Sequence, residues 1–150
     1  TMASPPAGRT QPGAAAIGDY IYVVGGTGTN PTYLYRYDPG ADSWSSSLAP
    51  IPNATGFGPV VAALNGKLHV VGGADSFPST TRHYEYDPAA DTWTSRAAHP
   101  RGVSMAARGV INNVLYVAGG IKSSGSDFRA ETDRYIPLPA EGWTVTGQII

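Results

Sequence analysis

Hydrophobic and polar positions alternate along this chain in short runs, and one pattern of runs occurs three times. Each copy has an apolar stretch that ends in two glycines and later a single tryptophan. Between them, two copies have two tyrosines that alternate with polar residues, and the third has one tyrosine. The three apolar stretches are Ile21–Gly26, Leu68–Gly73 and Leu115–Gly120. Apolar and polar residues that alternate over four to eight positions predict β-strands, so the pattern indicates an all-β chain.

The spacing of the copies is nearly constant. The glycine pairs begin at Gly25, Gly72 and Gly119, 47 residues apart both times, and the tryptophans are Trp44, Trp93 and Trp143, 49 and 50 residues apart. A fixed period of this length is typical of repeat architectures built from one supersecondary unit. We therefore expect one repeat domain over residues 1–150, with units at about 1–50, 51–98 and 99–150.

Each unit contains four predicted strands. The first strand has small or branched apolar residues, as in Ala14–Ile17 and Val60–Leu64, and a two-residue turn joins it to the glycine-ended stretch. The turn residues are Gly18-Asp19, Asn65-Gly66 and Asn112-Asn113, types that tolerate the positive φ of a tight hairpin. The tyrosine run is the third strand, and the fourth is expected to begin at the tryptophan. Four antiparallel strands with a small-residue inner strand and an aromatic outer part fit a propeller blade.

The glycine pair, the Tyr-Asp-Pro at Tyr37–Pro39 and Tyr86–Pro88, and the spaced tryptophan resemble kelch repeats. The third copy departs from the pattern, because Ile136 stands in place of the aspartate. The resemblance implies a kelch-type β-propeller segment of three four-stranded antiparallel blades. Propellers of this family usually close with six or seven blades, so the segment resembles half of a six-bladed ring.

A row of three blades would leave two apolar blade faces in water, and we expect something to cover them. One interpretation is a homodimer whose two copies close a six-bladed ring. The other is further kelch blades, with this chain a piece of a longer protein. The first residues, Thr1–Pro5, align at an offset of 47 with Leu48–Pro52, which lie between the first and second units. We therefore expect Thr1–Pro5 to belong to a connection between two blades, which favours the second interpretation.

The composition of the chain disfavours some classes of partner. The 150 residues carry 10 basic and 11 acidic side chains, a net charge of −1, and no cysteine. The balance of charge disfavours nucleic acid as a partner, and no apolar stretch is long enough for membrane insertion. The lack of cysteine excludes disulfides and thiolate sites and leaves the compartment open, with an extracellular or periplasmic location compatible.

The loops between the second and third strands differ in length: 10, 12 and 14 residues separate the glycine pairs from Tyr37, Tyr86 and Tyr135. Variable loops usually carry the function of a repeat fold, so we expect a protein or glycan to bind at the face that these loops form with the connections between blades. His83 and His99 are also expected on that face. The predicted binding residues are Arg9, Asn30, Tyr33, Asp75, Phe77, Arg82, Arg101, Lys122, Phe128 and Arg129.

Catalytic chemistry has little support in the sequence. The three histidines lack the spacing of a zinc site, no catalytic trio is marked, and no cofactor is expected. The copper centre of galactose oxidase, a kelch-type enzyme, needs a cysteine. Glu131 and Asp133 share one face of a predicted strand, where a solvated outer edge is the favoured interpretation. Two alternatives stay open: a carbohydrate-processing isomerase resembling sialic-acid mutarotase, and a structural repeat of a larger surface assembly.

Overall fold

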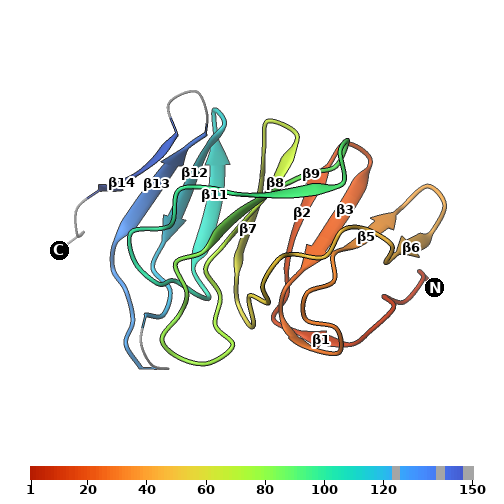
Figure 1. Ribbon diagram of the computed structural model, residues 1–150, viewed down its shortest axis with the longest axis horizontal. Coiled ribbons are helices and arrows are strands. Elements are labelled where there is room, and N and C mark those ends of the chain that lie inside the picture. Colours follow the sequence, from red (N-terminus) through yellow and green to blue (C-terminus); the bar gives the residue numbers. More distant parts are fainter. Residues whose placement is uncertain (123–125, 138–140, 147–150) are drawn as a thin grey trace.

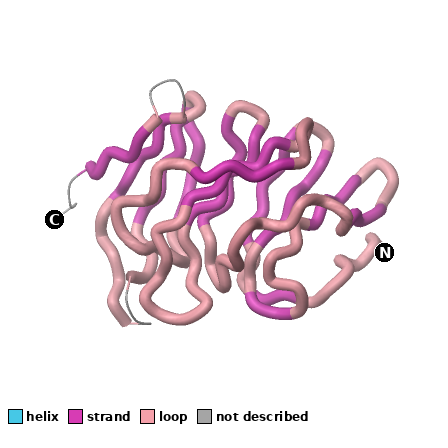
Figure 2. Tube along the Cα trace, in the orientation of Figure 1, coloured by secondary structure: helices cyan, strands magenta, loops and turns pink. Residues whose placement is uncertain are grey.

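The computed structural model describes residues 1–122, 126–137 and 141–146, and in these residues every regular element is a β-strand (Figures 1 and 2). Three four-stranded antiparallel sheets stand side by side in chain order (Figure 1). Blade 1 consists of β2 (Gly13–Ile17), β3 (Tyr20–Val24), β5 (Tyr35–Asp38) and β6 (Ser43–Ser45). Blade 2 consists of β7 (Val60–Leu64), β8 (Lys67–Val71), β9 (His83–Asp87) and β10 (Thr92–Ser95). Blade 3 consists of β11 (Ala107–Ile111), β12 (Val114–Ala118), β13 (Thr132–Ile136) and β14 (Gly142–Thr146).

The predicted blade is confirmed in each copy. The strands pair in chain order within every sheet, and the first hairpin of blade 2 turns at Asn65 and Gly66, which both have positive φ. The fourth strand begins one residue before the tryptophan, not at it: Tyr37 pairs with Trp44 and Tyr86 with Trp93. No helix long and apolar enough to cross a membrane occurs among the described residues.

A fourth, two-stranded sheet was not foreseen from the sequence. It pairs β1 (Arg9–Thr10) with β4 (Thr27–Gly28) and ties the connection before blade 1 to the loop after its glycine pair. Phe57↔Ala74 and Ser104↔Ile121 are its counterparts at offsets of 47 and 94 residues. The connection that enters each blade is therefore fastened to a loop of the same blade.

Each blade has two faces that pack differently. We call the face that carries the tryptophan the front face and the opposite one the back face. Tyr22 and Val24 on the back face of blade 1 join Leu68, Val70 and Tyr86 on the front face of blade 2 in one buried cluster. A second buried cluster joins the back face of blade 2 to the front face of blade 3; it contains Val60, Ala62, Leu64, Val71, Val103, Leu115, Val117 and Tyr135. The core therefore lies between the sheets, as the aromatic content of the repeats predicts.

A hydrogen-bonded lock recurs on each front face. The indole Nε1–H of Trp44, Trp93 and Trp143 donates to the carbonyl of Ala3, Ala49 and Ala97, at 3.0, 2.8 and 2.9 Å. The amides of the same three alanines donate to Asp42, Asp91 and Glu141, at 2.8, 2.8 and 2.7 Å. We call the segment that leads from each of these alanines into the following blade the strap.

The straps correct the alignment of the first residues. Ala3 has the place of Ala49, an offset of 46, where the sequence suggested 47.

Hydrogen bonds from the Ala3 amide and the Tyr37 hydroxyl hold the pKa of Asp42 below its usual value. The hydrogen bond to Asp42 in turn raises the pKa of Tyr37 to about 12. The strap, the carboxylate and the aromatic pair thus form one hydrogen-bonded unit in blades 1 and 2.

Replacing Trp93 by phenylalanine should lower the free energy of unfolding by about 1–2 kcal/mol, because the Ala49 carbonyl loses its donor while an aromatic ring still packs on Tyr86. Urea unfolding followed by circular dichroism measures the change. Tyr33→Phe, at a ring that is 41% exposed, is the control and should leave the midpoint unchanged. Equal midpoints for Trp93→Phe and wild type would contradict a structural role for the lock.

Candidate functional site

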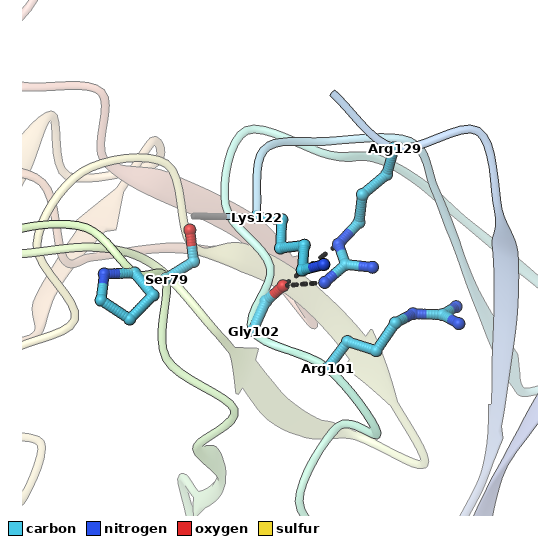
Figure 3. A pocket seen from close by; sticks show the side chains of 6 residues that line it. Ser79, Arg101, Gly102, Lys122 and Arg129 are labelled. Atoms are coloured by element: carbon cyan, nitrogen blue, oxygen red, sulfur yellow. Dashed lines mark hydrogen bonds between the residues drawn. The ribbon is translucent and has the colours of Figure 1, made fainter. Parts of the chain in front are cut away.

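A pocket of about 320 Å³ opens between blades 2 and 3 on the face formed by the long loops (Figure 3). Three separate segments line it: the β8–β9 loop, the strap that enters blade 3, and the β12–β13 loop. The lining residues are Pro78, Ser79, Arg101, Gly102, Lys122 and Arg129. Three of the six are basic, which makes the pocket a concentration of positive charge on a chain of net charge −1.

Backbone hydrogen bonds fix the three segments against one another. The Ser79 amide donates to the Lys122 carbonyl at 2.8 Å, and the Ser79 hydroxyl lies 3.0 Å from the Ile121 carbonyl. Gly102 passes so close to Ser79 that an added Cβ would stand 1.9 Å from the Ser79 carbonyl oxygen. Only glycine fits there, so the floor of the pocket is set by backbone contact and not by side chains.

The basic side chains of the pocket differ in how many hydrogen bonds they already make within the protein. Arg129, whose side chain is 5% exposed, donates from Nε and Nη2 to the Gly102 carbonyl, at 3.2 and 2.9 Å. Its remaining nitrogen, Nη1, lies 3.7 Å from a Glu131 oxygen, beyond hydrogen-bond distance. Figure 3 shows Lys122 beside this guanidinium and Arg101 directed away from it. Lys122 and the Nη1 edge of Arg129 are therefore the cationic groups that a ligand could meet first.

Arg101 serves as a support for the pocket wall. Its Nη2 lies 2.5 Å from both carboxylate oxygens of Asp133, which is 3% exposed, and its Nη1 is 3.9 Å from Glu131. Glu131 has a lowered pKa, chiefly through its own backbone amide, with Arg101 and Arg129 adding to the effect. The expectation that Glu131 and Asp133 face the same way is confirmed by their shared arginine. The solvated outer edge is wrong for Asp133, because the blade 2–3 contact buries it.

The two histidines expected on the loop face lie between the blades, and that expectation is wrong. His99 is 2% exposed; Nδ1 lies 2.6 Å from the Arg101 carbonyl and Nε2 3.2 Å from Asp133. His83 belongs to β9 and is also 2% exposed, with Nδ1 3.1 Å from the Ala97 carbonyl. His69 lies in β8 and is 1% exposed.

The structure places the ten predicted binding residues in different surroundings. Arg101, Lys122 and Arg129 come together at the pocket, and Phe128, next to Arg129, is 73% exposed. Asp75 is exposed on the β8–β9 loop, where Phe77 packs edge-on against Phe57 at 5.5 Å between ring centroids.

The other predicted residues lie apart from the pocket. Arg82 donates to the Ala54 carbonyl at 3.3 Å. Arg9 donates to the carbonyls of Gly25 and Asn30 and stacks over Tyr35, which fastens the first strap to blade 1. Tyr33 is 41% exposed on blade 1. The sequence thus gave no means of separating a strap arginine such as Arg9 from a pocket arginine such as Arg129.

Comparisons with known proteins agree with this architecture. Residues 8–47 match the family described as Kelch motif, which is typical of propeller interaction modules. A solved structure titled "Structure of YjhT" superposes with a TM-score of 0.84 at 20% sequence identity, over 99% of this chain and 55% of that one. The chain thus spans little more than half the length of that structure. No curated protein matched the sequence.

Proposed function

We propose that this chain, a kelch-type propeller segment of three blades whose ring is not closed, is a binding module for a carboxylate-bearing sugar or glycan. The observation behind the proposal is that three basic side chains line one pocket of the long-loop face: Lys122 and Arg129 from the β12–β13 loop and Arg101 from the strap. Pro78 and Ser79 line the pocket from blade 2, so the complete pocket exists only where blades 2 and 3 pack together. Such an arrangement suits an anionic group better than a neutral one.

The chemistry of the pocket favours a carboxylate. A guanidinium edge and an ammonium group give charge-assisted hydrogen bonds, which are about twice as strong as neutral ones. The Arg129 side chain is almost fully buried, so its charge is poorly screened by water. Glu131 and Asp133 neutralise part of the positive charge, which leaves room for one additional anionic group and not for a polyanion.

The size of the pocket favours a small ligand. A volume of about 320 Å³ is at the lower end of the range for small-molecule sites, where a single sugar ring fits. A protein partner would need a contact of about 800 Å² on each side, which a cavity that holds one sugar ring does not provide. We therefore place the sugar acid ahead of a protein as the ligand.

D-Glucuronate and D-glucose are matched probes, because they differ only in a carboxylate where glucose has a hydroxymethyl group. We expect calorimetry to detect binding of glucuronate and none of glucose. Lys122→Ala and Arg129→Ala should each weaken glucuronate binding roughly tenfold, because each removes one charged donor. Arg36→Ala is the control, since Arg36 lies over Tyr20 on blade 1, away from the pocket. Equal binding of both sugars, or unchanged affinity in both pocket variants, would contradict the proposal.

The enzymatic alternative, a sialic-acid mutarotase-like isomerase, is separated by a second readout. Proton NMR of N-acetylneuraminate measures the exchange between its two anomers with and without the protein. For a binding module we expect no acceleration. Faster exchange that is lost in Lys122→Ala would favour the isomerase, and acidic peptides that bind where glucuronate does not would favour a protein ligand.

A further inference from the structure

No described residue covers the back face of blade 3 in the way that the next blade covers the back faces of blades 1 and 2. Ile111 at the end of β11 is 63% exposed, whereas its counterpart in blade 2, Leu64, is 1% exposed. Tyr116 and Ala118 are half-buried. The residues at these two positions in blades 1 and 2 are between 0 and 2% exposed: Tyr22, His69, Val24 and Val71. A face of the same design is thus covered twice and open once.

The surroundings of the glycine pairs also show that blades 1 and 2 are covered on the back face and blade 3 is open. An added Cβ would stand 2.5 Å from Thr55 Oγ1 at Gly25 and 2.0 Å from the Val103 carbonyl oxygen at Gly72, because the strap of the next blade presses on both. At Gly119 the nearest atom is 3.6 Å away, an ordinary contact.

The second glycine of each pair shows the missing contact in its amide. The amides of Gly26 and Gly73 donate to the carbonyls of Gly56 and Val103, both at 2.7 Å. In the part of the chain that the structure describes, no acceptor faces the Gly120 amide. Blade 3 therefore offers a place for a strap carbonyl that none of the described residues fills.

Blade 1 carries the complementary surface. Its front face holds the Tyr37–Trp44 pair, with 4.9 Å between the ring centroids, and its strap is already locked by Ala3. Ile21 on this face is 38% exposed, whereas its counterparts Leu68 and Leu115 are 0% exposed against the preceding blade. The front face of blade 1 has the same pattern as the front faces of blades 2 and 3, and none of the described residues covers it with a back face.

We propose that the back face of blade 3 binds the front face of blade 1 of a second copy of this chain, so that two copies close a six-bladed ring. The interface continues the two inter-blade contacts already present and uses the equivalent positions of the repeat. Arg9 lies 47 residues before Gly56, which lies 47 before Val103, so the Arg9 carbonyl of the second copy would accept from the Gly120 amide. A two-fold axis along the ring makes both interfaces equivalent and leaves no open face.

The length comparison agrees with this number of copies. Nearly all of this chain superposes on 55% of the YjhT structure, so a ring of that size needs about as much chain again. A second copy supplies that length with the blade faces in the right order. Each copy contributes one open back face and one open front face, so each open face of one copy packs against an open face of the other.

The test is the mass of the 150-residue chain by light scattering after size exclusion, over a tenfold range of concentration. We expect a constant mass of twice 15.6 kDa. Gly119→Ala and Ile111→Asp should each reduce the mass to 15.6 kDa without loss of the β-sheet circular dichroism spectrum, because the first intrudes on the incoming strap and the second places a charge in the interface.

Two control variants separate the interface from general damage. Gly66→Ala changes a glycine whose φ of +72° is close to the +69° of Gly119 but which has no atom within 4 Å of an added Cβ. Val145→Asp changes a residue that is 46% exposed on the opposite face of blade 3. Both should keep the doubled mass. A wild-type mass of 15.6 kDa, a ladder of larger species, or a doubled mass that survives Ile111→Asp would overturn the proposal; the first of these outcomes would point to further blades in one polypeptide as the cover.

Discussion

Gly72→Ala should prevent the chain from folding into three packed blades. An alanine Cβ there would stand 2.0 Å from the Val103 carbonyl oxygen and 2.8 Å from a Val103 side-chain carbon. The φ of +67° adds strain of its own. Because Val103 is 1% exposed and its carbonyl accepts from the Gly73 amide, neither blade can yield without losing that bond. We expect a loss above about 4 kcal/mol, as for other severe clashes in a core.

Gly66→Ala separates the clash from the strain. Gly66 has φ +72° and nothing within 4 Å, so alanine there should destabilise by only about 1 kcal/mol. Soluble yield and thermal unfolding followed by circular dichroism compare the two variants. If both unfold at similar temperatures, blades 2 and 3 are not packed as closely as described.

Acidification from pH 7 to pH 4 should lower the free energy of unfolding by several kcal/mol. Burial is the main cause, because it lowers the pKa of His69 to about 4 and that of His83 to about 3. Both rings are at most 2% exposed, and Nδ1 of His69 lies 2.9 Å from Nε2 of His83. Arg96 and Lys67 add repulsion toward a proton on His69, whereas Glu85 attracts one.

The sign follows from which state takes up protons. In the unfolded chain histidine protonates near pH 6.5, whereas the folded rings stay neutral down to about pH 4 and 3. Between these values the unfolded state binds more protons, so stability is complete above pH 6.5 and falls as the pH drops. Each ring accounts for roughly 1.4 kcal/mol per pH unit within its window.

The repeats suggest the variant for this experiment. The residues that correspond to His69 and His83 in blade 1 are Tyr22 and Leu34, so the double change His69→Tyr and His83→Leu inserts residues that already fit this position. We expect urea midpoints between pH 7 and pH 4 to become nearly constant, with a remainder from His99, whose pKa burial also lowers. The control, Tyr33→His, adds an exposed histidine and should not change the slope. A wild-type midpoint that stays constant over this range would refute the account.

Strand order was predictable because it depends on local signals. The alternation in Ile21–Val24 and the turn residues Asn65-Gly66 act within a few positions, and the structure has the expected hairpins there. The third blade kept its architecture although Ile136 replaces the aspartate, since strand pairing between β13 and β14 does not need the turn carboxylate.

Contacts between blades were not predictable in the same way, because they join residues far apart in the sequence. His99 reads as a loop residue, yet it takes the buried place of Ile51, two residues after the strap alanine. The basic pocket needs Pro78 and Ser79 of blade 2 to pack against the segments that carry Arg101, Lys122 and Arg129. A weak signal existed: Ala-x-x-Pro precedes each blade, at Ala3–Pro6, Ala49–Pro52 and Ala97–Pro100, and an acidic residue stands two positions before each tryptophan.

The strap also determines where one module ends and the next begins. Because the lock on Trp93 comes from Ala49, residues 49–96 form a self-contained insert, whereas a cut at the first strand of the blade would separate Trp93 from its acceptor. A segment duplicated to lengthen the array by one blade, in evolution or by design, should therefore include both the strap and the sheet. The boundary that matters for such exchange runs through a connection and not along the edge of a sheet.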